Sequence, residues 1–239
     1  MHGKELLIKG IEELGIEVNE IQIQQFLKYY EMLVETNKVM NLTGIVDLDE
    51  VIVKHFLDSL LVVKVIDMTK YNSMIDVGTG AGFPGIPLKI MFPHLRVTLL
   101  DSLNKRLIFL NDVIKELQLK NIETVHGRAE DIGKDNEYRE RYDICVSRAV
   151  ANLSTLAEYC IPFISKEGKF ISYKSEFSEE EKENAEKAIF ELGGTVCGSV
   201  TEQLPLSDIQ RRFILIDKKR RTPNKYPRKA GVPSKKPIM

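Results

Sequence analysis

A glycine-rich stretch at residues 73–85, SMIDVGTGAGFPG, constrains the fold of this chain more than any other feature of its sequence. Three apolar residues lead into three glycines: Met74, Ile75, Val77, Gly78, Gly80 and Gly82. This pattern predicts a buried strand that turns abruptly into a helix, because glycine accepts positive φ angles and lets the backbone approach a ligand closely. We therefore expect the first strand and the ligand loop of an α/β domain, with Asp76 where ligands of such sheets bind.

The spacing within this loop separates two classes of ligand. The dinucleotide fingerprint requires a third glycine at the position that Phe83 occupies, and this disfavours NAD. A Gly-x-Gly-x-Gly turn is instead typical of domains that bind S-adenosylmethionine. A glycine-rich turn can also be a plain connection between a strand and a helix, so the motif alone does not identify the ligand.

Composition excludes several classes of protein. The chain has 239 residues, 43% hydrophobic and 29% charged, which fits one globular domain with an extension. No apolar run approaches the roughly 20 residues of a membrane span, and the N-terminus interleaves charged and apolar residues, unlike a secretory signal. Cys145, Cys160 and Cys197 lack metal-ligand spacing. We expect a cytoplasmic protein with reduced thiols, no metal and no membrane contact.

The net charge of -1 conceals a segregation of charge along the chain. Residues 218–239 contain nine basic residues and no acidic one, which leaves 25 basic and 35 acidic residues, a net charge of -10, before them. Prolines interrupt the basic tail, residues 220–239, and favour an extended chain that cannot form a helix. A disordered, solvated end is one interpretation. We favour RNA binding through phosphate contacts, since only Tyr226 offers a stacking surface.

The order of patterns along the chain predicts the fold. Residues 1–68 carry three helical patterns, the second and third opening with capping residues at Asn19 and Asp47, and form an N-terminal helical extension packed on the main domain. In the main domain, residues 69–219, strand and helix patterns then alternate. The strands expected after the glycine loop are residues 96–100, 122–126, 142–147, 168–173, 195–204 and 211–218.

The connection before the last strand is the most informative one. Only six residues, Pro205 to Gln210, separate the last two strands, too few for a crossover, so these strands must run antiparallel. Five alternating strands followed by a hairpin predict an α/β fold: the Rossmann-like, seven-stranded sheet of the class I S-adenosylmethionine methyltransferases. An ordinary NAD domain lacks that terminal antiparallel hairpin.

Two further positions are candidates for cofactor binding. Asp101 follows the second strand, 21 residues after Gly80, where an acidic residue accepts hydrogen bonds from ribose hydroxyls. A cap for the helix that follows is the alternative, and the two roles are compatible. After the third strand, the backbone near Ala129 and the Glu130 carboxylate lie where adenine is normally read. A solvated turn is the alternative there.

The end of the fourth strand indicates the chemistry. Enzymes that methylate exocyclic amines usually have Asn or Asp, two prolines and an aromatic residue at this place, whereas this chain has Ser147-Arg148-Ala149-Val150. Methylation of a pyrimidine at C5 through a covalent adduct requires a nucleophilic cysteine, and Cys145 and Cys160 are poorly placed for that role. The acceptor is then an atom such as a purine ring nitrogen, whose lone pair needs no general base. Arg148 suits contact with the cofactor, or positioning of a guanine or phosphate, and a structural ion pair is its alternative role.

Histidine supplies a weaker signal. Lys54-His55 in the third helical pattern can contact substrate, but a lone helical histidine is more often a packing or surface residue.

Six stretches taken in order are specific to one family. They are Asn41-Leu42-Thr43, Lys54-His55-Phe56-Leu57-Asp58-Ser59, the glycine stretch from Asp76 to Gly85, Gly127-Arg128-Ala129-Glu130, Ser147-Arg148-Ala149-Val150 and Lys225-Tyr226-Pro227-Arg228-Lys229. Together they resemble the RsmG family, also called glucose-inhibited division protein B, over nearly the whole chain. The resemblance implies a methyltransferase that uses S-adenosylmethionine to methylate guanine N7 in the decoding-centre loop of 16S ribosomal RNA.

The resemblance also implies a site and a partner. The residues that it places against the cofactor are Gly78, Phe83, Ala129, Glu130 and Arg148. Gly80, Gly82 and Asp101 are added from the loop and ribose arguments. The implied partner is 16S ribosomal RNA or the small ribosomal subunit. Three other interpretations stay open: a small-molecule methyltransferase, a NAD-linked oxidoreductase, and an RNA-binding module that has lost catalysis.

Overall fold

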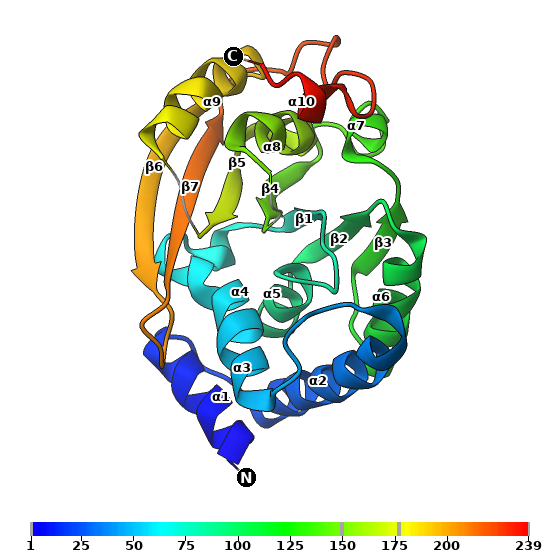
Figure 1. Cartoon of the computed structure of the whole chain (residues 1–239), viewed down its shortest axis with the longest axis vertical. Helices are drawn as coiled ribbons and strands as arrows, with labels where there is room; N and C mark the ends of the chain where they lie inside the picture. The colour runs from blue at the N-terminus through cyan, green and yellow to red at the C-terminus, as the bar shows by residue number, and fades with distance from the viewer. Residues whose placement is uncertain (1, 149–150, 176–177, 239) are drawn as a thin grey trace.

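A seven-stranded sheet forms the centre of the computed structural model, which describes residues 2–148, 151–175 and 178–238 (Figure 1). Its strands lie in the order β3-β2-β1-β4-β5-β7-β6. Their bounds are β1 Ser73–Val77, β2 Arg96–Asp101, β3 Ile122–His126, β4 Tyr142–Ser147, β5 Ile164–Lys174, β6 Gly194–Gln203 and β7 Gln210–Lys218. Strands β1 to β5 pair in parallel, and β7 pairs antiparallel with both β5 and β6. The predicted sheet with its terminal hairpin is confirmed.

Helices cover both faces of this sheet. The longer helices are α1 His2–Glu13, α2 Glu20–Met40, α5 Gly85–Met91, α6 Asn104–Glu116, α8 Leu153–Cys160 and α9 Glu179–Glu191. The shorter ones are α3 Leu48–Val51, η1 Ile52–Leu57, α4 Asp58–Leu60, η2 Leu61–Lys64, η3 Met68–Lys70, α7 Ala129–Ile132, η4 Ile161–Phe163 and α10 Val232–Lys235. None of the helices in the described part of the chain is both long and apolar enough to cross a bilayer.

Alternate residues along a strand belong to two different hydrophobic cores, one on each face of the sheet. On β1, Met74 belongs to the core shared with α1, α2, α5 and α6, whereas Ile75 belongs to the core shared with α8 and α9. This division follows from the two-residue period of a strand. The N-terminal helices therefore pack on the sheet as expected, although the predicted boundaries at residues 68 and 219 stay predictions.

The helix before β1 begins as predicted but continues differently. Asp47 caps it, and its Oδ1 accepts a hydrogen bond from the Glu50 N–H at 3.1 Å. After one α-helical turn, residues Ile52–Leu57 wind as a π-helix. π-Helical turns are rare and occur frequently at functional sites. This one contains His55 and ends next to Asp58, and both residues enter the site described below.

The expectation that the C-terminal tail is extended and free of helix is wrong. The tail folds back over α7 and α8, and residues 232–235 form α10 (Figure 1, red). Pro233 lies in the first turn of that helix, where its missing N–H has no helical partner to lose.

Candidate cofactor and acceptor site

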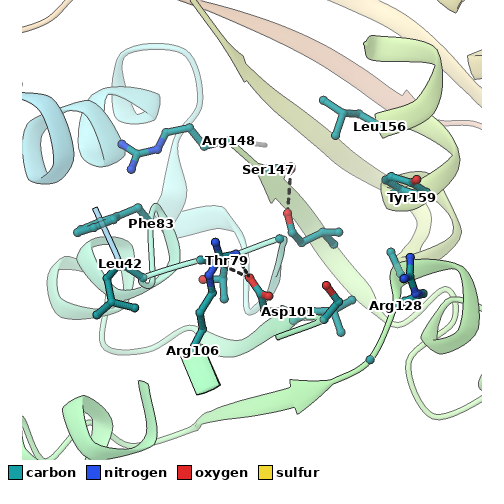
Figure 2. Close-up of a pocket in the computed structure, with 18 of the residues that line it drawn as sticks. Leu42, Thr79, Phe83, Asp101, Arg106, Arg128, Ser147, Arg148, Leu156 and Tyr159 are labelled. Atoms are coloured by element: carbon teal, nitrogen blue, oxygen red, sulfur yellow. Dashed lines mark hydrogen bonds and ion pairs between the residues drawn. The ribbon is translucent and has the colours of Figure 1, made fainter. Parts of the chain in front are cut away.

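A cavity of about 600 Å³ lies at the carboxyl ends of the central parallel strands (Figure 2). The loops after β1, β2, β3 and β4 supply most of its lining, and residues from the N-terminal helices and from α8 complete it. The lining residues are 77–81, Phe83, 100–102, Arg106, 127–130, Ser147, Arg148, Leu42, Thr43, His55, Leu156 and Tyr159. The volume suits one ligand of cofactor size, and the place is where open α/β sheets bind ligands.

The glycines of the β1 loop have different roles. Gly78 and Gly80 line the cavity with φ angles of 74° and 62°. A Cβ on Gly80 would have only the Gly78 carbonyl oxygen nearby, at 4.0 Å, so the space beside it belongs to the cavity. Gly82 is not among the lining residues, and its Cβ would lie 2.6 Å from the Tyr29 hydroxyl. Gly82 is thus required for packing of the loop against α2.

Asp76 holds this loop through hydrogen bonds at both of its ends. Its Oδ2 accepts hydrogen bonds from the Thr79 hydroxyl at 2.7 Å and from the Gly85 N–H at 2.9 Å. Its Oδ1 is buried and has no hydrogen-bond partner within the described residues. Burial raises the pKa of Asp76 to about 6. A buried carboxylate oxygen without a donor is uncommon, and Asp76 itself is fully buried directly before the cavity-lining residues Val77 and Gly78.

Asp101 accepts a hydrogen bond at the start of the following helix, as its alternative role predicted, and it also lines the cavity. Its Oδ1 accepts a hydrogen bond from the Leu103 N–H at 2.9 Å, immediately before α6. Its Oδ2 accepts from the Gly80 N–H at 2.9 Å and pairs with Arg106 at 3.2 Å. The carboxylate therefore joins the β1 loop to the β2 loop while facing the cavity (Figure 2). Its contact with a ribose stays a prediction.

Ala129 and Glu130 form the start of α7 and line the cavity beside the β2 loop. Glu130 is only 4% exposed, so it is not part of a solvated turn. Its Oε1 accepts a hydrogen bond from the Gly231 N–H at 2.8 Å, a donor from the C-terminal tail. No local pattern indicated this contact between residues 101 positions apart.

Arg148 lies at the opposite end of the cavity and is held by a buried carboxylate. Its Nη1 donates to Asp58 Oδ2 at 2.7 Å, and its guanidinium carbon lies 5.1 Å from the centre of the Phe83 ring. Arg211 Nε donates to Asp58 Oδ1, also at 2.7 Å. Asp58 is fully buried. Arg148 therefore forms the structural ion pair and also faces the cavity, while Ala149 and Val150 lie outside the described residues.

His55 belongs to this end of the cavity, although its pattern suggested packing or the surface. Its ring stacks on Phe83 with a centroid distance of 4.6 Å, and its Nε2 lies 2.8 Å from the Thr43 hydroxyl. Burial, together with the charge of Arg148, lowers the pKa of His55 to about 4. The imidazole is thus neutral at physiological pH. The only sequence signal was its place in the Lys54 to Ser59 stretch.

The cysteines offer no nucleophile to the cavity. Cys145 and Cys160 are buried, and burial raises the pKa of the Cys145 thiol, so it stays protonated. Among residues 2–148, 151–175 and 178–238, no group of three His, Cys, Asp or Glu side chains is arranged to hold a metal ion.

Comparison with known proteins identifies the family. The family described as rRNA small subunit methyltransferase G matches residues 22–217. The chain belongs to this family. It is 51% identical over 238 residues to a ribosomal RNA small subunit methyltransferase G from Alkaliphilus metalliredigens, with 100% of both chains covered. A protein of the same name from Acetivibrio thermocellus is 53% identical over 235 residues, covering 98% of this chain and 96% of that protein.

Solved structures support the fold independently. A methyltransferase from Pyrococcus furiosus is similar with a TM-score of 0.55, covering 82% of this chain and 98% of that one at 13% identity. At that identity the likeness concerns the fold alone, and it confirms the class I methyltransferase architecture. Family membership confirms the predicted resemblance and makes this chain a methyltransferase, which excludes the oxidoreductase interpretation.

Proposed function

We propose that this protein transfers a methyl group from S-adenosylmethionine to N7 of a guanine in the decoding-centre loop of 16S ribosomal RNA. We call the end of the cavity lined by His55, Phe83 and Arg148 the acceptor end. Beyond family membership, one observation supports the choice of atom: within the described residues, this end offers no group that could effectively take up a proton. His55 is a weak base because its pKa is about 4, and Asp58 is engaged by two guanidinium groups. A ring nitrogen with a free lone pair is an acceptor that needs none.

The cavity residues fit the cofactor part by part. S-adenosylmethionine supplies an activated methyl group on a sulfonium. Gly80 leaves room for a ligand to approach the backbone closely, and Gly78 lines the cavity beside it. Asp101 is the proposed ribose ligand. Ala129 and Glu130, at the same end, are proposed to contact the adenine.

Phe83 and Arg148 lie with His55 at the acceptor end of the cavity, and the family resemblance implies that both contact the cofactor as well. Phe83 is covered by the His55 ring, and the Arg148 guanidinium is fixed by Asp58. A guanidinium held in one orientation can position a guanine or a phosphate by directed hydrogen bonds. Because the acceptor needs only correct placement, holding it still accounts for a large part of the rate.

Contact with ribosomal RNA would fall on exposed basic residues. Lys229, Lys235 and Lys236 of the tail are exposed and lie on the segment that crosses α7 and α8. Phosphate contacts of this kind make binding weaken steeply with added salt. An acceptor that is a ribosomal RNA also places the proposed activity in the cytoplasm.

The proposal is tested by incubating the protein with labelled S-adenosylmethionine and 16S ribosomal RNA from cells that lack this enzyme, supplied both naked and as 30S particles. Nucleoside mass analysis should find the label on guanine N7. Label on an exocyclic amine or a ribose hydroxyl would contradict the proposal. Label only on small molecules of a cell extract would replace it with a small-molecule methyltransferase.

A further inference from the structure

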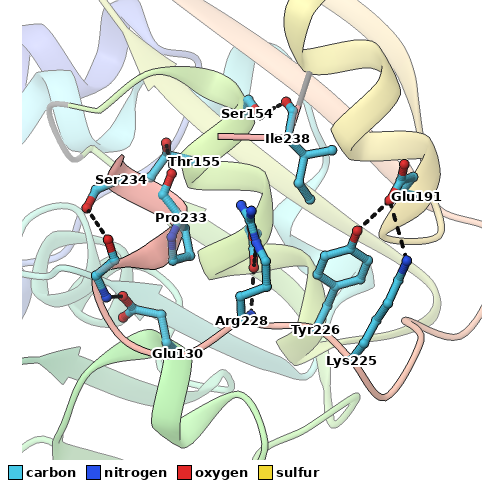
Figure 3. A network of polar contacts seen from close by, with 12 residues as sticks. Glu130, Ser154, Thr155, Glu191, Lys225, Tyr226, Arg228, Pro233, Ser234 and Ile238 are labelled. Carbon is cyan, nitrogen blue, oxygen red and sulfur yellow. Dashed lines mark hydrogen bonds and ion pairs between the residues drawn. The ribbon is translucent and has the colours of Figure 1, made fainter. Parts of the chain in front are cut away.

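The C-terminal segment, residues 222–238, is built into the body of the protein rather than projecting from it (Figure 3). Thr222, Tyr226 and Ile238 are at most 9% exposed, and the latter two belong to the core formed with α8 and α9. The Tyr226 hydroxyl donates a hydrogen bond to Glu191 of α9. A free RNA-binding arm would not bury an aromatic ring in this way.

Arg228 anchors the segment to α8. Its guanidinium bonds both oxygens of Glu158, with Nη2 at 2.6 Å from Oε2, and its backbone N–H donates to Oε1 at 2.6 Å. The Glu158 residue is fully buried. Such a paired arrangement of charge-assisted bonds fixes both partners in orientation as well as in distance. The same helix carries Leu156 and Tyr159, which line the cofactor cavity.

Gly231, three residues after Arg228, reaches the cavity wall itself. Its N–H donates to Glu130 Oε1 at 2.8 Å, and Glu130 is both buried and part of the cavity lining. Gly231 has a φ of 81°, which glycine accepts without strain, at the start of α10. Beyond it, the Thr155 hydroxyl donates to the Pro233 carbonyl at 3.2 Å, and the Ser154 hydroxyl donates to the Ile238 carbonyl.

We infer that residues 222–238 position the adenine end of the cofactor site, with Arg228 as the positioning residue that holds the Gly231 amide against Glu130. The segment thereby contributes to cofactor affinity, independently of any contact that its exposed lysines make with RNA. This inference rests on the cofactor proposed above. Residues 222–238, far from the glycine loop in sequence, thereby help to control how tightly the cofactor binds.

The test compares Arg228→Gln with the matched control Arg221→Gln, a tail arginine whose side chain is 92% exposed. Affinity for S-adenosylhomocysteine is measured by calorimetry, and hydrogen exchange is followed at the amides of residues 129–132. We expect Arg228→Gln to weaken binding about tenfold or more and to speed that exchange, because Glu130 loses its fixed donor. The control should stay within about twofold of the parent. In steady state, KM for the cofactor should rise more than KM for RNA.

Arg228→Lys keeps the positive charge but not the two-pronged geometry, so it protects the test against a variant that fails to fold. We expect an intermediate loss of affinity. Folded Arg228 variants that bind S-adenosylhomocysteine as the parent does would overturn the inference. If the parent protein itself shows no affinity for S-adenosylhomocysteine or S-adenosylmethionine, the proposed function fails instead, so the two failures are distinguishable.

Discussion

Replacing Asp58 with Asn tests whether this carboxylate holds the acceptor end of the cavity together. Asp58 is fully buried, and the side chains of its two partners, Arg148 and Arg211, are only 17% and 16% exposed. Asn keeps the shape and one hydrogen-bond acceptor but removes the negative charge, leaving two poorly solvated guanidinium groups without a counter-charge. Breaking a buried ion pair on one side typically costs about 3–5 kcal/mol.

We expect Asp58→Asn to lower the free energy of unfolding by about 3 kcal/mol, toward the lower bound because Asn retains one bond. Urea denaturation followed by circular dichroism at pH 7 measures this directly. The control is Glu116→Gln, which removes one partner of an exposed ion pair with Lys28 and should cost less than about 1 kcal/mol. A loss below 1 kcal/mol for Asp58→Asn would refute the reasoning, since the two guanidinium groups would then not depend on this carboxylate.

Three further predictions concern the glycine loop and His55. Gly82→Ala places a Cβ 2.6 Å from the Tyr29 hydroxyl and should cost about 2–4 kcal/mol in thermal unfolding, whereas Gly15→Ala, also at positive φ but with no atom within 4 Å, should cost about 1 kcal/mol. Gly80→Val should abolish calorimetric binding of S-adenosylmethionine while leaving the protein folded; retained affinity would show that the cofactor does not lie against this loop. The low pKa of His55, about 4 against 6.5, means that the unfolded chain takes up the proton first. The stabilisation that depends on neutral His55 is therefore complete above pH 6.5 and is lost as the pH falls toward 4. When the pH is lowered from 7 to 5, the free energy of unfolding of His55→Gln, measured in urea titrations, should rise by about 2 kcal/mol relative to that of the parent. An unchanged difference between the two proteins across that range would contradict it.

Local patterns predicted most of the sheet because strands are defined by neighbouring residues. The bounds of β3 and β4 agree with the pattern, and the short connection before β7 indicated its direction. Strand β5 begins at Ile164, four residues before the expected start at Gly168. The prediction was late because Gly168 resembled a turn residue that precedes a strand. The capping residue Asp47 is likewise confirmed, but nothing in the sequence indicated that the helix after it winds as a π-helix.

The site was harder to predict because its decisive contacts join distant residues. Spacing indicated Gly80 and Asp101, which line the cavity, but also Gly82, which does not. Asp58 meets Arg148 across 90 positions and Gly231 meets Glu130 across 101. Charge composition suggested an extended tail, either bound to RNA or solvated, since it cannot show that Arg228 is paired with Glu158 in the interior. Such pairings are set by tertiary packing, which no local pattern contains.

The central claim is that the acceptor atom attacks without first losing a proton to a protein base. The pH dependence of the single-turnover rate tests this most directly, with saturating S-adenosylmethionine and ribosomal RNA between pH 7 and pH 8.5, above the pKa of Asp76 at about 6. The account predicts a rate that changes less than about twofold across this range, because neither the acceptor nor a catalytic base titrates in it. A logarithmic rate that rises with unit slope and levels off within this range would reveal an essential base and contradict the account.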